Sequence, residues 1–552
     1  MFKVLRRWDR DLAKTIWATG LLGQKTLYSS IRLGNRVKLT KKLSSGKRVR
    51  RPSLDEITSI AKSAYLTLSP EEKESIEGLV DEILVNYDIV DSLPEPSLGK
   101  NEGKRDGGSR PSKGEDPYNA FIRKCTIKGA ESGRLLGWLV AVKDNVSVRG
   151  VPMTNASRVC DGYIPDVDAT VVTRLLEEGA VIIGKTNMDD MSCLCTSESS
   201  CFGPVSNPFN PQYSPGGSSS GSAVAVATGQ ADLAISVDQG GSARMPAAWC
   251  GVASIKATHG LVPTFGLSYI DLTIDHVCPT ARSVKDLALA LEVMAGEDDR
   301  DPQWVKGPIK VEKYTDYTST RTLPGVRIGL LREGMEWPFS DAGVNDMIRN
   351  SLSKMEQLGA EVSDTSIPLF KHATTIYNAA LTISSTAMIE SDGEGYWHGG
   401  YHNVRWNEFF GRARRERADY FSPPVKLAMI AGKYMRNEYF GVHYSKAQNL
   451  RRQLREEVDE QLDRFDVLAL PTIPMNPVRL EAKLTFKEMA NRDANIFNNC
   501  CPFNLTGHPA ISIPCSMVNG FPVGLQMVAK HFDEATLFKV SGAFENSFDW
   551  RG

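Results

Sequence analysis

Residues 214–251 read SPGGSSSGSAVAVATGQADLAISVDQGGSARMPAAWCG. Two glycine–serine clusters flank a small-residue segment, Ser220–Thr228, which we expect to be a helix, and an apolar segment, Leu233–Val237, which we expect to be a strand. Because the clusters join these apolar elements without a spacer, we predict buried, shaped loops rather than flexible linkers. Strand–helix alternation of this kind is typical of an α/β sheet with helices on its faces.

The same alternation continues on both sides of this stretch. We expect a buried strand at Leu135–Val142, a helix at Thr170–Glu178 and a strand at Ala180–Ile183, with returning core strands at Val467–Pro471 and Ala510–Pro514. The charge-rich stretch 333–465 favours a smaller helical subdomain inside the α/β domain, which we place at 118–545. The fold class predicted from these patterns is α/β.

The N-terminal part has a different pattern. Residues 53–68 and the segment that begins at Ser69 and Pro70 each start with a helix-capping sequence and carry an apolar stripe. We therefore predict a helical hairpin at 52–92 and, because its stripes need a partner, expect it to mediate homodimerisation. A basic tail at 1–51 precedes it, and a linker at 93–117, rich in Pro, Gly, Ser and charge, follows it.

Composition limits the classes of function. The 552 residues carry a net charge of −1, so the whole chain has no field that demands nucleic acid. Residues 1–51 hold 15 Lys and Arg against two Asp, which fits a solvated tail, a mitochondrial transit segment, or a segment that contacts a membrane or nucleic acid. Ten cysteines without a C-x-x-C pair indicate a reducing compartment. We expect a cytoplasmic protein, with the mitochondrial matrix as the alternative, and no membrane span.

The second glycine–serine cluster is the strongest candidate site. In Gly240-Gly241-Ser242, two consecutive glycines let backbone amides converge on one point beside a serine. Such a nest suits an oxyanion, so we predict Ser242 as a nucleophile with Gln239, Gly240 and Gly241 supplying the oxyanion hole.

Other motifs compete with this interpretation. Gly217 to Gly221 also fits the G-x-S-x-G elbow with Ser219 as nucleophile, but no strand precedes it and only His508 could be nominated as its base. His398 and His402 are four residues apart, but Gly399 and Gly400 between them exclude a helix that presents both. We therefore expect no metal, and no phosphate-binding loop of the G-x-x-x-x-G-K-S/T kind is present to hold a nucleotide. No cofactor is predicted.

Taken together, the stretch 214–251 and the segment Val140-Ala141-Val142-Lys143-Asp144-Asn145 resemble the amidase signature family, over about residues 118–545. The form Asp238-Gln239-Gly240-Gly241-Ser242 is most similar to the bacterial enantiomer-selective amidases found beside nitrile hydratases. The resemblance implies a central mixed sheet and a Ser-cisSer-Lys triad of Ser242, Ser218 and Lys143, with a cis bond at Gly217–Ser218. Ser220 and Ala243 depart from the family pattern, where Gly and Ile are usual.

The chemistry that the resemblance implies is physically reasonable for these residues. Lysine is almost wholly protonated at pH 7 in water, but burial at the end of an apolar strand lowers its pKa and allows Lys143 to act as a base. We expect Asp238 and Arg244 to brace the nucleophile loop. Met191, Phe202 and Trp249 are candidates for the acyl pocket.

The expected function is hydrolysis of a small organic amide to an acid and ammonia or an amine. Alternatives are the glutamine-hydrolysing subunit of a tRNA-dependent amidotransferase, a carbamate or aryl-amide hydrolase, and a scaffold with a dead site. We expect a small-molecule amide substrate, no nucleic acid and a homodimer.

Overall fold

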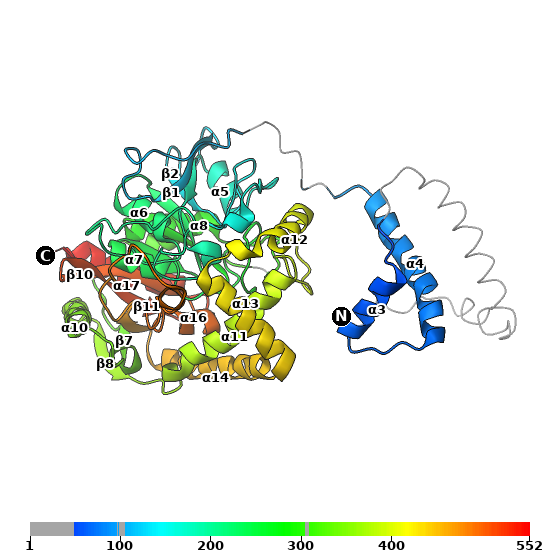
Figure 1. The fold of residues 1–552 in the computed structure, drawn as a ribbon. Coiled ribbons are helices and arrows are strands. Elements are labelled where there is room, and N and C mark those ends of the chain that lie inside the picture. Colours follow the sequence, from blue (N-terminus) through cyan, green and yellow to red (C-terminus); the bar gives the residue numbers. More distant parts are fainter. Residues whose placement is uncertain (1–48, 97, 99–104, 304–308, 552) are drawn as a thin grey trace, which may run out of the picture. The chain divides into compact units, whose positions relative to one another are not determined.

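The computed structural model of this protein describes residues 49–96, 98, 105–303 and 309–551. The chain divides into two compact units with a boundary between Glu102 and Gly103 (Figure 1). Almost all of the predicted basic tail, and part of the predicted linker, lie outside the described residues. The predicted domain boundaries therefore remain predictions.

The first unit contains two helices, α3 (Leu54–Ser63) and α4 (Pro70–Ser92). Each begins with a complete capping box, made by Ser53 with Glu56 and by Ser69 with Glu72, so two otherwise unpaired amides are satisfied at each start. Helix α3 ends earlier than predicted. The apolar stripe of α4 is only partly covered: Leu79 and Ile83 are exposed, and the others are half-buried. Its most exposed large apolar side chains are Leu79, Ile83, Tyr87 and Val90.

The second unit is built on one mixed sheet of 11 strands in the order β1-β3-β2-β4-β6-β5-β10-β11-β9-β7-β8. Strand β2 is parallel to both β3 and β4, and β7 is parallel to both β8 and β9, while the remaining pairs are antiparallel. The strands are β1 (Phe121–Lys128), β2 (Leu139–Lys143), β3 (Val181–Thr186), β4 (Leu233–Asp238), β5 (Ala253–Lys256), β6 (His276–Ala281), β7 (Arg327–Leu331), β8 (Glu361–Thr365), β9 (Val467–Pro471), β10 (Ala510–Val518) and β11 (Phe521–Val528).

Helices surround this sheet (Figure 1). They are α5 (Thr170–Glu177), α6 (Ser220–Ala227), α7 (Arg244–Cys250), α8 (Val284–Met294), α9 (Arg332–Met335), α10 (Ala342–Gln357), α11 (Phe370–Glu390), α12 (Val404–Arg417), α13 (Pro423–Tyr439), α14 (Val442–Arg464), α15 (Phe486–Ala490), α16 (Cys501–Thr506) and α17 (Glu534–Ser547). The predicted α/β class with a central mixed sheet covered by helices is confirmed.

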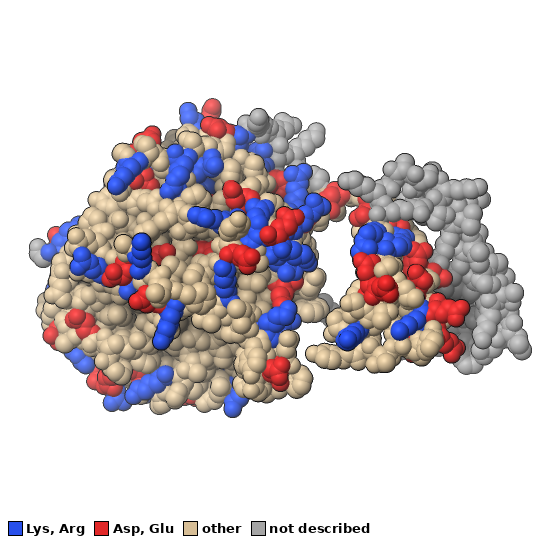
Figure 2. All heavy atoms as spheres, in the orientation of Figure 1, with Lys and Arg blue, Asp and Glu red and all other residues tan. Residues whose placement is uncertain are grey.

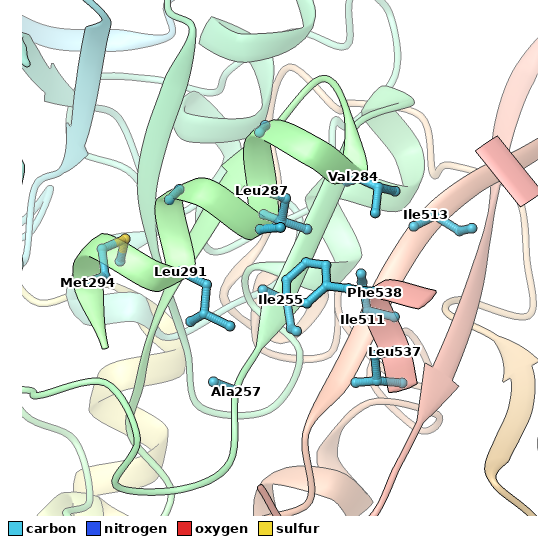
Figure 3. Packing of buried hydrophobic residues seen from close by; sticks show 14 of the residues in the cluster. Ile255, Ala257, Val284, Leu287, Leu291, Met294, Ile511, Ile513, Leu537 and Phe538 are labelled. Carbon is cyan, nitrogen blue, oxygen red and sulfur yellow. The ribbon is translucent and has the colours of Figure 1, made fainter. Parts of the chain in front are cut away.

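Alternation along the strands divides the core into two layers. In β2, Val140 and Val142 pack into the core under α5, α8, α10 and α17, whereas Ala141 packs on the opposite face with α6 and α7. In β9, Leu468 and Leu470 face α11, α14 and α16. Figure 3 shows the first layer, where Leu287 and Leu291 of α8 and Phe538 of α17 meet Ile255 of β5 and Ile511 of β10.

Element boundaries differ from the predictions in places with a local cause. The strand predicted from Leu135 begins at Leu139, because Gly137 has a positive φ of 79° and the chain turns there. Strand β3 runs on to Thr186, and β10 runs to Val518, beyond the predicted ends. The stretch 333–465 supplies α10 to α14 but also β8, an edge strand of the same sheet.

The surface of the larger unit mixes charges of both signs on the face seen in Figure 2, as the small net charge leads one to expect. Among the described helices, none combines the length and the apolar character that a membrane crossing requires.

Candidate active site

Lys143 is the last residue of β2 and is completely buried. Alternation along the strand points its side chain to the face covered by α6 and α7, where Nζ donates a hydrogen bond of 2.8 Å to Ser218 Oγ. The neighbouring Asp144 points to the other face. Its carboxylate accepts from Thr154 N at 2.8 Å and lies 3.5 Å from Lys185 Nζ, so it does not compete for Ser218.

Burial changes the proton affinity of this lysine. Loss of hydration lowers the pKa of Lys143 from 10.5 to about 7, and the carboxylates of Asp189 and Asp238 oppose this shift only partly. A substantial fraction of neutral amine is therefore present near pH 7. A neutral amine 2.8 Å from a hydroxyl can accept its proton.

Ser218 lies in the first glycine–serine loop, directly before α6, and is completely buried. The peptide bond between Gly217 and Ser218 is cis. The amide of the next residue, Ser219, donates to the carbonyl oxygen of Ser242 at 3.0 Å and so ties this loop to the second one. The described residues show no direct hydrogen bond between the Ser218 and Ser242 hydroxyl groups. Lys143 and Ser218 are thus in contact, and Ser242 is held beside them through Ser219.

Ser242 follows Gly240 and Gly241 in the turn between β4 and α7, and only 5% of it is exposed. An ion pair of 3.0 Å between Asp238 and Arg244, both completely buried, spans this turn. Arg244 also donates to Asn504 and Gln526 at 2.7 Å. Burial works against the ionised carboxyl, but the charge and hydrogen bonds of Arg244 outweigh it and hold the pKa of Asp238 below its usual range. The bracing predicted for these two residues is therefore present.

The backbone amides of the nest do not all point the same way. Gly241 N donates to Asp238 Oδ1 at 2.7 Å, so this amide serves the turn and not an oxyanion, which corrects the prediction for Gly241. The amides of Gln239, Gly240 and Ser242 have no acceptor among the described residues. Gly240 is needed for space, because a Cβ there would meet the hydroxyl of Tyr377. Three donors thus remain for a developing negative charge.

A cavity of about 760 Å³ opens beside Ser242. The nucleophile turn contributes Gln239, Gly240 and Ser242 to its wall, and most of the rest comes from residues 191–195, from α11 and α13, and from residues 490–498. Its large apolar lining residues include Trp337, Leu381, Ile389, Val425, Leu427 and Phe497. Lys371 and Asp493 are the only charged side chains among the described residues of the wall.

Of the three residues predicted to line the acyl pocket, only Met191 lies in the wall of this cavity. Trp249 lies seven positions after Ser242, about 10 Å along a helix axis, and is buried against Met245 and Ile473 outside the cavity. Phe202 packs on a small cluster near Met188, also outside it.

Asp189 is a site residue that the sequence patterns did not identify. It is completely buried, accepts hydrogen bonds from Ser197 N at 2.9 Å and Ser199 Oγ at 2.8 Å, and donates its own amide to Ser218 O at 3.3 Å. Burial raises the pKa of Asp189 to about 7, close to that of Lys143. The available signal was the acidic pair at 189–190 just after a predicted strand.

The competing motifs are not supported by the geometry. Ser219 Oγ donates to Val237 O at 3.0 Å and is completely buried, so it is not presented to the cavity. His508 Nε2 pairs with Asp459 at 2.8 Å, and the ring does not line the cavity.

Comparison with known proteins gives a consistent result. A family model described as Amidase matches residues 120–538. A glutamyl-tRNA(Gln) amidotransferase subunit from Natronomonas pharaonis is 39% identical over 77% of this chain and 99% of that protein. The enantioselective amidase of Rhodococcus rhodochrous is 36% identical over 79% of this chain and 84% of that protein. The crystal structure of the corresponding glutamyl-tRNA(Gln) amidotransferase subunit from Thermotoga maritima has a TM-score of 0.65 at 29% identity, and the match covers 78% of this chain and 88% of that one.

Proposed function

This chain belongs to the Amidase family and is a hydrolase of amide C–N bonds, and on that premise we propose that it cleaves a small carboxamide through an acyl-enzyme on Ser242. The predicted family is confirmed. The observation that carries the proposal is the hydrogen bond of 2.8 Å between buried Lys143 and Ser218, in a loop tied to the turn of Ser242. A buried lysine with a lowered pKa is a base only if its partner can give up a proton, and a hydroxyl can.

In the proposed first step, neutral Lys143 takes the proton of Ser218, and Ser218 takes the proton of Ser242. The Ser242 oxygen then attacks the amide carbon. The oxyanion that forms accepts hydrogen bonds from the amides of Gln239, Gly240 and Ser242, each of which can lower the barrier by about 3 kcal/mol.

In the second step the C–N bond breaks. Ser218 returns a proton to the nitrogen, so ammonia or an amine leaves and the acyl group stays as an ester on Ser242. A water molecule then gives its proton to the same relay and attacks the ester, which frees the carboxylic acid and restores the Ser242 hydroxyl. Asp189, beside the relay, acts as a positioning residue that holds the Ser218 loop through its amide.

The cavity favours an amide with an apolar acyl group. Most of its large lining residues are aromatic or aliphatic, and such walls stabilise apolar groups by excluding water from them. The side-chain amide of Gln239 is buried at the cavity wall and interacts with the carboxyl of Asp275, but neither of its polar atoms makes a hydrogen bond of normal geometry to the described residues. A substrate carboxamide would compete with Asp275 for it.

A second candidate is glutamine hydrolysis within a tRNA-dependent amidotransferase, and two observations favour it. The relatives from Natronomonas pharaonis and Thermotoga maritima carry the name of a subunit of that enzyme. Lys371 and Asp493 place one cation and one anion in the wall, which is the pair of charges that an amino acid zwitterion needs. In this case the protein works with partner subunits, and the predicted homodimer is replaced by a hetero-complex.

One experiment separates the two. Ammonia release by the purified chain is measured with aliphatic and aromatic carboxamides, carbamates and glutamine, for the native protein and for Lys371→Met and Asp493→Asn. Turnover of apolar amides that survives both substitutions supports the first candidate. Glutamine turnover whose KM rises at least tenfold in both variants supports the second. If Ser242 is not labelled by a fluorophosphonate and no amide is cleaved, the first candidate is wrong. The second is wrong if glutamine is still not cleaved when the partner subunits are present.

A further inference from the structure

The loop between α11 and α12 holds two histidines that the rest of the molecule leaves unexplained. Both ring nitrogens of His398 are buried and neither makes a hydrogen bond of normal geometry to the described residues, although the ring interacts with the backbone of Glu394. A buried polar atom without a partner costs about 1–3 kcal/mol, so such a ring indicates a ligand that completes it. The ring of His402 is stacked on it, with 3.9 Å between the centroids.

A carboxylate completes the group. Ligand atoms of Glu394, His398 and His402 all lie within 4.8 Å of one another. Glu394 is only 4% exposed.

The chain around these residues is well anchored. Tyr401 N donates to Arg300 O at 2.9 Å, and Trp406 Nε1 donates to Gly393 O at 3.2 Å. Gly400 packs against the backbone of residues 300–302, where a Cβ would not fit. No helix is required to bring the two histidines together, because the anchored loop does so. Gly399 and Gly400 exclude a helix that presents both histidines, and this was the reason to expect no metal site here. They do not exclude a loop that brings the two rings together.

We propose that Glu394, His398 and His402 form a binding site for one divalent transition-metal ion, with Zn²⁺ favoured by the two imidazoles and one carboxylate. Two nitrogen ligands and one oxygen ligand suit zinc, and a water can take the fourth position. The two stacked rings must splay apart to direct one nitrogen each at the ion. The ion would clamp the connection between α11, which lines the Ser242 cavity, and α12. It is a structural site and takes no part in the Ser242 chemistry.

A second His–carboxylate group among the described residues differs in the state of its ring nitrogens. Asp459, His508 and His531 also lie close together, but their ring nitrogens are largely occupied. His508 bonds Asp459 at 2.8 Å and Thr506 Oγ1 at 2.9 Å, and His531 Nε2 bonds Thr506 O at 3.1 Å. Metal binding there would break existing bonds, so it serves as an internal comparison.

The test uses the full chain, freed of metal by dialysis against a strong chelator. Zn²⁺ is titrated calorimetrically, and Co²⁺ is titrated while its visible absorption is recorded. We expect one equivalent to bind in the micromolar range or tighter. His398→Gln, His402→Gln and Glu394→Gln should each weaken binding by at least about 100-fold, since loss of outer-shell partners alone costs 10–100-fold. His443→Gln, an exposed histidine outside the group, and His531→Gln should bind as the native chain does.

Absence of saturable micromolar binding by the native chain overturns the proposal. So does binding that His398→Gln leaves intact, or binding that only His531→Gln removes, which would assign the ion to the other group. Should His398→Gln fail to fold, the His402 and Glu394 variants decide the same question. Amide hydrolysis by the chelated protein should persist. Loss of hydrolysis that added Zn²⁺ restores would contradict the statement that the ion takes no part in the Ser242 chemistry.

Discussion

Lys143 and Lys256 each end a strand of the central sheet, and both are completely buried, but their hydrogen-bond partners differ. Lys143 donates to the hydroxyl of Ser218. Lys256 donates to two carbonyl oxygens, of His508 at 2.6 Å and of Ala257 at 3.1 Å, and its Nζ lies 3.4 Å from Nε2 of His276. Burial lowers the pKa of each from 10.5 to about 7.

The pair shows that burial creates a basic amine but does not decide its use. A carbonyl oxygen has no proton to give. His276 donates Nδ1–H to Ile274 O at 2.7 Å, so its Nε2 is an acceptor as well, and Lys256 can only hold its neighbours in place. A hydroxyl both donates and accepts, so Lys143 can pass a proton onward. If the proposal for Ser242 holds, the function of each lysine follows from its partner rather than from its pKa.

The largest effect should come from the nucleophile itself. Ser242→Ala should lower kcat by about 10⁶-fold, because no other group can hold the acyl chain. Labelling by a fluorophosphonate probe and ammonia release measure this directly. Labelling that persists in the variant would mean that another serine is the nucleophile, with Ser219 the first to examine.

The relay should behave as one unit. Lys143→Ala should lower kcat/KM by about 10²–10⁴-fold, since the reaction loses its base. Ser218→Ala should cost a similar factor, and the double variant should be hardly worse than Lys143→Ala alone, because members of a unit are strongly non-additive. Steady-state kinetics of the four proteins test this. If the fold-loss in kcat/KM of the double variant equals the product of the two single losses, Lys143 and Ser218 act independently and the proposed relay is wrong.

The pH profile should tell the two lysines apart. Below pH 7, Lys143 carries its proton and cannot act as a base, so kcat/KM should fall about tenfold per pH unit and level off above pH 7. This ascending limb should vanish in Lys143→Ala and remain in Lys256→Met. A limb that survives without Lys143 would point to another group, such as Asp189, whose pKa is also raised to about 7.

Lys256→Met should alter stability and leave the Ser242 chemistry intact. It leaves two buried carbonyls with one donor fewer, at a cost of about 1–3 kcal/mol. The pKa of Lys256 is lower in the folded protein than in the unfolded chain. Between pH 7 and 10 the unfolded wild-type chain therefore binds more protons than the folded one, and the wild-type protein gains stability as pH rises. The deficit of the variant in denaturant unfolding should therefore be larger at pH 9 than at pH 7. An equal deficit at both would mean that Lys256 does not titrate as proposed.

The smallest effect on turnover should come from the N-terminal hairpin. A chain of residues 92–552 lacks the partly exposed stripe of α4 and should be monomeric by light scattering, with kcat/KM unchanged. A dimer that survives the truncation would show that the hairpin is not the contact, and a loss of turnover would show that it supports the site.

Part of the site was predictable because it is local in the chain. The strand–helix alternation, the glycines before Ser242 and the lysine that ends β2 all lie in short stretches of sequence, so pattern and resemblance predicted the α/β class and proposed three candidate site residues. Asp189 was missed because an acidic residue in a loop has no distinctive local pattern. The pocket candidates Phe202 and Trp249 were misplaced because aromatic side chains in core and cavity look alike in sequence.

What the sequence by itself determined is the order of elements, the family and the residues available for chemistry, since propensity, periodicity and motif spacing depend on neighbours in the chain. Only the tertiary structure decided the partners. It placed Lys143 on a hydroxyl and Lys256 on carbonyls, directed the Gly241 amide to Asp238, and brought His398 and His402 together through an anchored loop. These contacts join segments up to 252 residues apart. Burial and partner choice arise only when such segments pack against each other, because packing is what removes water from a polar group and leaves it one neighbour to bind.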